Sequence, residues 1–162
     1  MKVFKEEQRF NQWLLWVGIL SFGFLIIYGT IKQIFYNIPF GNKPMSNVGI
    51  VFFSSFYLLF IVLFRILKLE TKINENGVYY RFFPVHNNFK LIKWEVIKSV
   101  NIIKYKPITQ YGGWGIKHGS FTVKGNIGIQ LELKNNTKLL IGTQKKEEAT
   151  RVLETYSQKL IN

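Results

Sequence analysis

Two long stretches without formal charge dominate the first part of the chain. They cover residues 10–31 and 44–64, which are 22 and 21 residues long. At about 1.5 Å per residue in a helix, each stretch can cross a hydrocarbon core of roughly 30 Å. Core helices of soluble proteins are usually shorter and carry a polar face. We therefore predict two membrane-spanning helices, over about residues 11–31 and 46–66.

A cleaved signal peptide is the alternative interpretation of the first stretch. Its apolar run is longer than the apolar core of a typical signal peptide, and no small-x-small cleavage site follows it. Bulky and polar residues occupy the place of that site, namely Tyr28, Lys32, Gln33 and Phe35. The pattern therefore favours a helix that is retained.

The segment between the two predicted helices has turn chemistry, with Pro39, Gly41, Asn42 and Pro44 in close succession. It predicts a helical hairpin. Three Lys or Arg residues lie before the first predicted helix, and three lie at or just after the end of the second. The connection between the helices contains only two. The positive-inside rule then places both termini in the cytoplasm. No histidine or charged residue lies within either uncharged stretch, so we expect an anchor rather than an ion pathway.

The period of the pattern changes from Leu69 onward. Residues 126–134 alternate between apolar and polar positions, which predicts a half-buried strand. Asn135 and Asn136 form a turn signal before a second apolar strand over 138–143, so a hairpin is expected here. Further strands are predicted over 71–74, 78–83, 91–94 and 99–105, and from Phe121 onward.

The last segment, 144–161, has helical spacing instead. Its apolar stripe consists of Ala149, Val152, Leu153, Tyr156 and Leu160, and it should dock on a sheet. The predicted fold is a membrane α-helical hairpin over 1–68, followed by an α+β soluble domain over 69–162. Within that domain we expect an antiparallel β-barrel of about seven strands, capped by the C-terminal helix.

Composition excludes several kinds of chemistry. The chain has no cysteine, no aspartate and two histidines, His86 and His118. Thiol nucleophiles, disulfides, iron–sulfur clusters and thiolate-rich zinc sites are therefore excluded. The two histidines lie 32 residues apart without ligand-like neighbours, and no GxSxG motif is present. We expect neither an enzyme nor a metal or cofactor site.

The formal net charge of +13 is shared by both parts of the chain, with +5 in residues 1–69 and +8 in residues 70–162. A basic domain tethered beside a membrane most simply faces anionic lipid headgroups, to which each Lys or Arg contributes about 1 kcal/mol. Nucleic acid is the other candidate polyanion. No helix-turn-helix, zinc-finger or RNP-type pattern is visible, and we do not expect nucleic-acid binding.

The most distinctive local feature is the glycine cluster of residues 112–115, which contains Trp114. It lacks the GxxxxGK[ST] and GxGxxG patterns of phosphate-binding loops. One interpretation is a bend between strands that lets Trp114 pack. The other is a loop that presents aromatic residues and nearby lysines to the bilayer interface or to a ligand. On that second interpretation the candidate lipid- or ligand-binding residues are Lys104, Lys106, Tyr111, Trp114, Lys117 and Lys124.

Several runs also resemble a known family. The runs YGGWGI over 111–116, GNIGIQL over 125–131, IGTQK over 141–145 and KWEVI over 93–97 are similar to those of bacterial two-span membrane proteins. That family is uncharacterised and has a pleckstrin-homology-like domain. The resemblance covers most of the chain, including both spans. It implies a two-span architecture with a PH-like domain, and it carries no activity. With the orientation from the positive-inside rule, we expect the bacterial cytoplasmic (inner) membrane, with the domain at its cytoplasmic face.

These observations leave two hypotheses about function. The first is a membrane-anchored, non-catalytic binding or scaffolding module whose PH-like domain contacts anionic lipid headgroups at the cytoplasmic leaflet. The second is a protein–protein interaction module of a membrane complex, in which the basic charge serves only topology and solubility. There a sheet edge, or the groove beside the C-terminal helix, would receive an unidentified protein partner.

Overall fold

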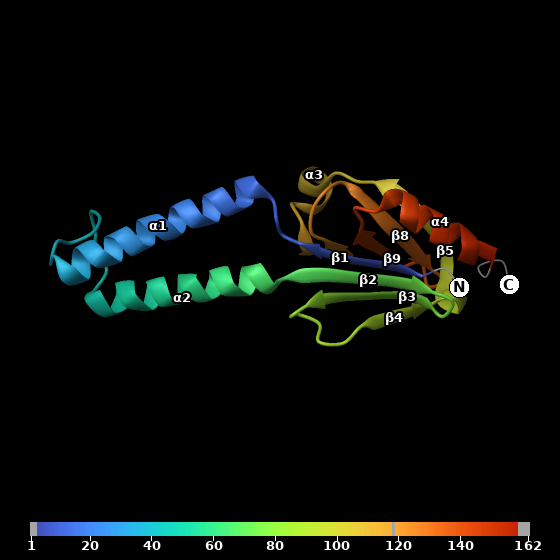
Figure 1. The fold of residues 1–162 in the computed structure, drawn as a ribbon, viewed down its shortest axis with the longest axis horizontal. Helices are drawn as coiled ribbons and strands as arrows, with labels where there is room; N and C mark the ends of the chain where they lie inside the picture. Colours follow the sequence, from blue (N-terminus) through green and yellow to red (C-terminus); the bar gives the residue numbers. More distant parts are fainter. Residues whose placement is uncertain (1–2, 118, 159–162) are drawn as a thin grey trace. The chain divides into compact units, whose positions relative to one another are not determined.

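The computed structural model describes residues 3–117 and 119–158, and the chain divides into two compact units (Figure 1). Asn11–Ile66 form one unit, here called the hairpin unit. The chain up to Phe10 and from Leu67 onward forms the other, here called the strand unit. The division expected from the sequence, at residue 68, differs at the N-terminus. Residues Phe4–Arg9 form strand β1, which pairs with later strands and groups with the strand unit.

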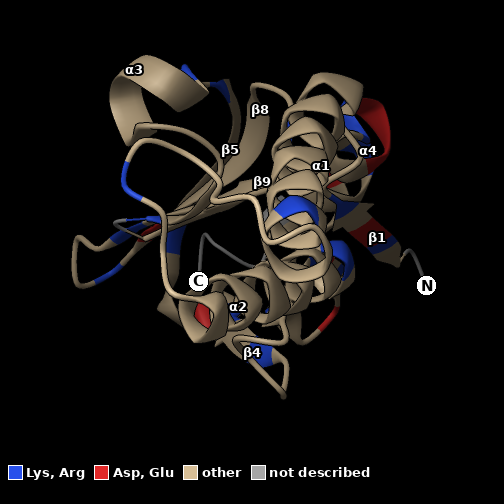
Figure 2. Ribbon diagram, turned by 90° about the vertical axis from the view of Figure 1, so that its left-hand side faces the viewer, with Lys and Arg blue, Asp and Glu red and all other residues tan. Residues whose placement is uncertain are grey.

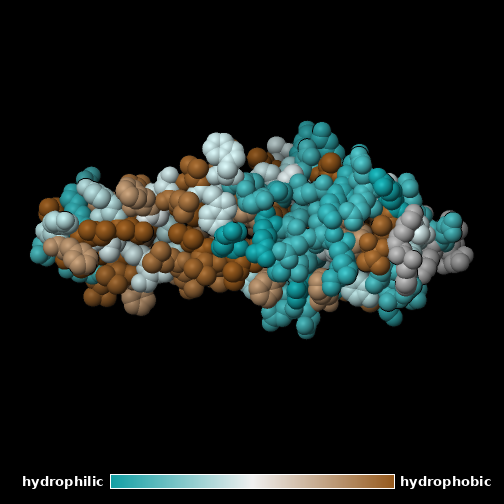
Figure 3. Space-filling model, in the orientation of Figure 1, coloured by the Kyte–Doolittle hydropathy of each residue, from teal (hydrophilic) through white to brown (hydrophobic). Residues whose placement is uncertain are grey.

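The hairpin unit consists of α1 (Trp13–Phe35) and α2 (Asn47–Ile66). Both helices are long and apolar enough to cross a membrane, as predicted. Large apolar side chains cover their surface, whereas the strand unit is mainly polar outside (Figure 3). Only a few residues of these helices are buried: Gly23, Ile26, Gly29, Gln33 and Ile50.

Small and hydroxyl residues hold the two helices together. Gly23 leaves room for the ring of Tyr57, because a Cβ at this position would lie 3.1 Å from the ring. The Tyr57 hydroxyl donates to the Ile19 carbonyl at 2.8 Å. The hydroxyl oxygens of Thr30 and Ser54 lie 2.6 Å apart, so one donates to the other across the interface. Such polar contacts between apolar helices contribute about 0.6 kcal/mol each.

The strand unit contains two sheets. The first has the order β1–β2–β3–β4 and is antiparallel throughout, with β2 (Lys68–Asn74), β3 (Gly77–Phe83) and β4 (Lys90–Lys93). The second has the order β5–β8–β9–β7–β6 and contains one parallel pair, β7 with β9. Its strands are β5 (Ile97–Lys104), β6 (Gly115–Lys117), β7 (Ser120–Thr122), β8 (Ile127–Leu133) and β9 (Lys138–Gly142).

Three helical segments complete this unit. They are the 3-10 helix η1 (Trp94–Val96), α3 (Pro107–Tyr111) and α4 (Lys146–Ser157). The α+β class is confirmed, and the predicted hairpin of β8 and β9 is present. The expected barrel is wrong in one respect, because the two sheets of four and five strands do not close into a barrel.

The predicted C-terminal helix packs as its apolar stripe requires. In α4, Ala149, Val152, Leu153 and Tyr156 are buried, while Leu160 lies outside the described residues. Tyr156 stacks on Trp94 with ring centroids 5.6 Å apart, and the Trp94 indole nitrogen donates to the Asn74 carbonyl at 2.9 Å. Trp94 therefore links α4 to the end of β2.

Buried polar side chains of β1 form hydrogen bonds with residues near the C-terminal helix. Its inward residues are Phe4, Glu6 and Gln8. Glu6, only 7% exposed, accepts hydrogen bonds from the Thr143 hydroxyl at 2.7 Å and from the Gln144 backbone N–H at 2.8 Å. The Gln8 amide donates to the Gly142 carbonyl at 2.6 Å. The first strand is therefore tied to the junction of β9 and α4.

Replacing Glu6 tests this attachment. We expect Glu6→Ala to lower the free energy of unfolding by about 2–4 kcal/mol, because the buried Thr143 hydroxyl and Gln144 N–H lose a charged acceptor. Denaturant unfolding of the full chain in detergent, followed by tryptophan fluorescence, measures this change. The control is Glu7→Ala on the outward face of the same strand, which should cost no more than about 1 kcal/mol. Equal losses for the two variants would contradict the role of Glu6.

Candidate functional site

The hairpin unit interrupts a single pair of hydrogen-bonded strands. Arg9, the last residue of β1, lies opposite Lys68, the first residue of β2. Three residues connect Arg9 to Trp13, where α1 begins, and only Leu67 separates α2 from β2. We call this end of the strand unit the hairpin end. The opposite end, which holds the β2–β3 turn and the β8–β9 turn, is called the far end.

Two other segments lie at the hairpin end. One is the loop 84–89 between β3 and β4, because Phe83 pairs with Lys68. The other is α3, which follows β5. A chain of contacts places it there: Gln8 of β1 bonds to Gly142, which pairs with Gly128, which pairs with Ile103 near the end of β5. In Figure 1, α3 and the end of β1 lie at the same end of the strand unit, and Figure 2 shows them on different sides of it.

The short helix α3 was not predicted from the sequence, although its boundaries have a signal. Pro107 occupies its first position, and Gly112 ends it in the left-handed conformation with φ of 63°. Proline at the start and glycine just after the end are the usual boundary residues of a helix. The expectation of strands on both sides of the glycine cluster is therefore wrong, since α3 precedes it.

A hollow of about 550 Å³ lies between the end of β5 and α3. Two of the predicted site residues, Lys104 and Lys106, both line it. Tyr105 between them is buried, and burial raises the pKa of its hydroxyl. Ile108 lines the same hollow and is 71% exposed. The remaining lining residues are Pro107, Thr109 and Asn126.

The two predicted aromatic residues are partly used in packing. Tyr111 contacts the ring of Tyr105 edge-on, with centroids 5.8 Å apart. The Trp114 indole donates to the Gly125 carbonyl at 2.8 Å and the side chain is 36% exposed. The hydrogen bond of Trp114 fits the interpretation in which the glycine cluster lets this side chain pack. Part of the Trp114 and Tyr111 rings nevertheless stays accessible.

The other two predicted lysines lie on different segments from the hollow. The Lys117 ammonium donates to the Gly112 carbonyl at 2.6 Å, so it closes the glycine loop. Lys124 is half-buried, and its carbonyl accepts a hydrogen bond from the Gln144 amide at 2.8 Å. The structure therefore brings Lys104 and Lys106 to one hollow, and it engages Lys117 and Lys124 in neighbouring loops.

The charge around α3 has one sign. Residues 99–131 contain four lysines, namely Lys104, Lys106, Lys117 and Lys124, and no acidic residue. Figure 2 views the molecule from the hairpin side and shows basic residues in the segments next to α3. The surface at α3 is therefore cationic, and no carboxylate within this stretch neutralises it.

A second group of charges lies where β1 and β2 meet the hairpin. The Lys68 ammonium lies 2.9 Å from Glu7 and 3.2 Å from Glu70, and Arg9 lies 2.8 Å from Glu7. Arg81 pairs with Glu70. Hydrogen bonds from Lys68 and Arg9 lower the pKa of the Glu7 carboxyl, and the bond to Glu7 raises the pKa of the Lys68 ammonium. Two carboxylates therefore face three cations here.

Aromatic rings extend this cluster towards the loop 84–89. Phe89 lies under two cations, with the Lys72 ammonium 4.2 Å and the Arg81 guanidinium 4.6 Å from its ring centroid. His86 in the same loop contacts the rings of Tyr80 and Phe121, and its burial, with the charge of Lys90, lowers the pKa of the imidazole. His118 lies outside the described residues.

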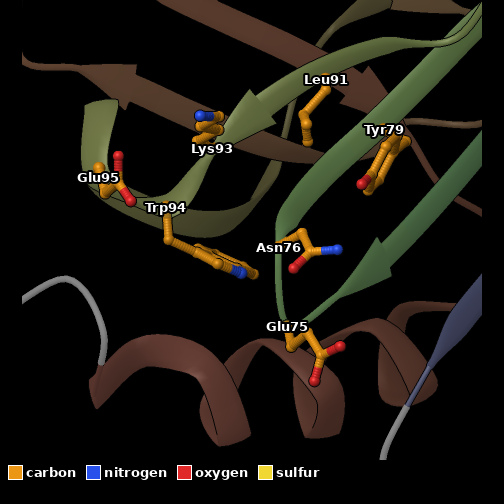
Figure 4. A pocket seen from close by; sticks show the side chains of 7 residues that line it. All are labelled: Glu75, Asn76, Tyr79, Leu91, Lys93, Trp94 and Glu95. Atoms are coloured by element: carbon orange, nitrogen blue, oxygen red, sulfur yellow. The ribbon is translucent and has the colours of Figure 1, made fainter.

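Two further hollows of the strand unit lie away from α3. One, of about 440 Å³, is at the far end beside Trp94 (Figure 4). Its charged lining residues are Glu75, Lys93 and Glu95. The other, of about 370 Å³, lies between β5 and α4. Among residues 3–117 and 119–158, no three histidine or acidic residues come together as a metal site.

Comparison with known proteins gives one family. A model described as "Family of unknown function (DUF6141)" matches residues 1–156. The chain belongs to this family. The match runs from β1 through both helices to α4, so this DUF6141 family includes the hairpin unit as well as the strand unit. A search of curated proteins found no match.

The ion pairs of Glu7 predict a pH dependence of stability. Because the pKa of Glu7 in the folded chain lies below its ordinary value of 4.5, its contribution is complete above pH 4.5. It is lost as the pH falls through the folded pKa. We expect Glu7→Gln to cost up to about 1 kcal/mol at pH 7, because the side chain is partly exposed, and less at pH 3.

Urea unfolding of wild type and Glu7→Gln in detergent, at steps between pH 7 and pH 3, measures this difference. Glu147→Gln is the matched control, since Glu147 is exposed and its contact with Arg151 is 3.8 Å long. A difference between wild type and Glu7→Gln that stays constant over the whole pH range would count against these ion pairs.

Proposed function

We propose that this chain is a membrane-anchored, non-catalytic binding module whose basic strand unit contacts anionic lipid headgroups. The observation that carries the proposal is the insertion of an apolar helical hairpin between two paired strands. If the two helices cross a bilayer, the strand unit is attached to it by two very short connections.

The reach of these connections keeps the hairpin end at the membrane surface. An extended residue spans at most about 3.6 Å, so the four steps from Arg9 to Trp13 cover about 14 Å. The two steps from Ile66 to Lys68 cover about 7 Å. Charges near an anionic surface are felt within a Debye length of about 8 Å. The shorter connection thus keeps Lys68 within the range where headgroups attract it, and the other basic groups of the hairpin end belong to the same sheet edge or its neighbours.

The same insertion supports the predicted topology. Because Arg9 and Lys68 are paired, the chain leaves and returns to the sheet at one place. The segment before β1 and the whole strand unit then lie on one side of the bilayer. Three Lys or Arg residues before the first helix and three at the end of the second, against two in the connection, favour the cytoplasmic side. For a bacterial protein, as the resemblance implies, this is the inner membrane with both termini in the cytoplasm.

A PH-like strand unit is part of this proposal. Strands β1–β4, β5, β8 and β9 are seven antiparallel strands that precede the helix α4, in the order expected for such a domain. On this interpretation, α3, β6 and β7 are an insertion between β5 and β8. The open arrangement of the two sheets is the difference from a closed barrel.

Neutralising the predicted lysines tests the headgroup contact. The full chain goes into nanodiscs with neutral or partly anionic lipid, and a fluorophore at Thr109→Cys reports quenching by nitroxide-labelled headgroups. Since the chain has no cysteine, the label is unique. We expect stronger quenching in anionic discs, reduced by high salt. Replacing Lys104, Lys106, Lys117 and Lys124 with Gln should abolish this difference, because each lysine contributes about 1 kcal/mol.

A matched variant removes the same charge at other sites. Lys93, Lys98, Lys134 and Lys138 lie at the end of a strand or in the turn at the far end, and their replacement with Gln should leave the quenching unchanged. If both quadruple variants behave alike, net charge rather than location is responsible. If anionic lipid has no effect on the wild type, the proposal of headgroup contact fails.

A protein-binding role is the second candidate, because a specific observation favours it. Strand β5 is one of the two edges of its sheet, and the apolar residues that line the hollow of about 370 Å³ beside it are Val100, Ile102 and Leu153. An extended peptide can add to such an edge through backbone hydrogen bonds while an apolar side chain enters the hollow.

Photo-crosslinking tests this role. A photoreactive residue in place of Asn101, an exposed residue of β5, should give a discrete crosslinked product in native membranes. A photoreactive residue in place of Asn136, in the β8–β9 turn, is the control and should give none. The absence of a reproducible product at Asn101 would remove the specific support for a protein partner.

A further inference from the structure

We propose that α3 is an interfacial anchor, which inserts Ile108 among the lipid chains just below the headgroups while Lys104 and Lys106 contact the phosphates. The inference rests on the proposed membrane anchoring and extends it, because it assigns the lipid contact to one small helix. The ligand class is the surface of a bilayer that contains anionic phospholipid.

The most exposed large apolar side chains of the strand unit lie at its hairpin end. Among the described residues of that unit, Ile108 is the most exposed large apolar side chain, at 71%. Val85 follows, at 61%, and lies in the loop between β3 and β4. Both belong to the hairpin end. Water contact of an isoleucine is unfavourable, whereas the interface of a bilayer offers an apolar environment for it.

The local structure holds Ile108 in a fixed position. The Gln110 side chain accepts a hydrogen bond from the Lys106 N–H at 2.7 Å, and the Gly112 N–H donates to the Ile108 carbonyl at 2.9 Å. The ring of Tyr111 packs on buried Tyr105. Ile108 is therefore presented by an ordered turn, so its insertion requires little additional ordering of the chain.

Basic residues accompany the apolar tip. Lys104 and Lys106 are exposed and line the hollow next to Ile108. Their ammonium groups can contact phosphates while their aliphatic parts lie along the interface. Apolar and basic residues on one short element are the combination that binds peripheral segments to anionic bilayers. We take the bilayer as the binding partner of α3, because the short connections at Arg9 and Lys68 keep the hairpin end near it.

The test compares two depths of quencher in the full chain. A fluorophore at Thr109→Cys is exposed to lipids brominated in the acyl chain or to lipids with a nitroxide headgroup, in nanodiscs that contain anionic lipid. We expect quenching by both. In the Ile108→Gln background the acyl-chain quenching should fall to less than about half, because the apolar side chain that drives insertion is gone. The label is identical in both proteins.

The controls separate insertion from other effects. Val96→Gln removes another exposed apolar residue, 46% exposed and in η1 at the far end, and should leave the acyl-chain quenching unchanged. A fluorophore at Asn76→Cys in the β2–β3 turn should show little quenching by either lipid. Unchanged unfolding temperatures of the variants show that the fold is intact, which is expected because Ile108 is exposed.

Each outcome has a distinct meaning. Headgroup quenching without acyl-chain quenching overturns the insertion of α3 and leaves the headgroup contact of the proposed function intact. Acyl-chain quenching that survives Ile108→Gln also overturns the role of Ile108. The absence of quenching by both lipids defeats this inference and the proposed headgroup contact together.

Discussion

The pairing of β1 with β2 is the constraint on which the rest of the structure depends. These two strands are neighbours in the sheet, yet residues 10–67 separate Arg9 from Lys68 along the chain. Loop-closure entropy grows only slowly with length, so a sheet tolerates such an insertion when the inserted segment is itself folded. Here it is a closed helical hairpin. The pairing requires the inserted segment to return to the point where it leaves the sheet, because β1 reaches β2 only if the hairpin turns back.

The buried carboxylate of Glu6 extends this constraint to the end of the chain. A buried charge is costly unless it is hydrogen-bonded, and Glu6 accepts from the Thr143 hydroxyl and the Gln144 N–H. These groups lie between β9 and α4. The position of the C-terminal helix, whose buried residues complete the core, is consequently linked to the first strand. A fragment that begins at residue 70 would lose β1. It would therefore also lose the hydrogen bonds from Thr143 and Gln144 to Glu6, just before α4. The strand unit therefore needs residues from both sides of the hairpin.

Much of this fold follows from local patterns, and the parts that do not have physical reasons. The uncharged stretches, the alternation of residues 126–134 and the stripe of α4 were sufficient to predict their elements. Strand β1 gave no such signal, because two of its three inward residues, Glu6 and Gln8, are polar and find their partners more than 130 residues away. The helix α3 is five residues long, too short for a period to appear. At the candidate site, the sequence named the four lysines but did not predict which of them converge; Lys104 and Lys106 line one hollow because they are close neighbours at the end of β5. The contacts of Trp114 with Gly125 and of Lys117 with Gly112 depend on the path of the glycine loop, which no pattern in the sequence specifies.

Tethering changes what a lipid contact has to achieve. A soluble domain must bind a membrane strongly enough to offset its loss of translational freedom, whereas a domain attached by two short connections already has a high effective concentration at the surface. One isoleucine and a few lysines are too little for the first task and sufficient for the second, which is to select one orientation. If the proposed lipid contact holds at the hairpin end, the far end, with the hollow beside Trp94, is the part of the strand unit left for other partners. The edge of β5 and the hollow next to α4 are not part of the proposed lipid contact. The lipid contact and a protein partner are thus compatible: the first would fix the direction in which the second is approached.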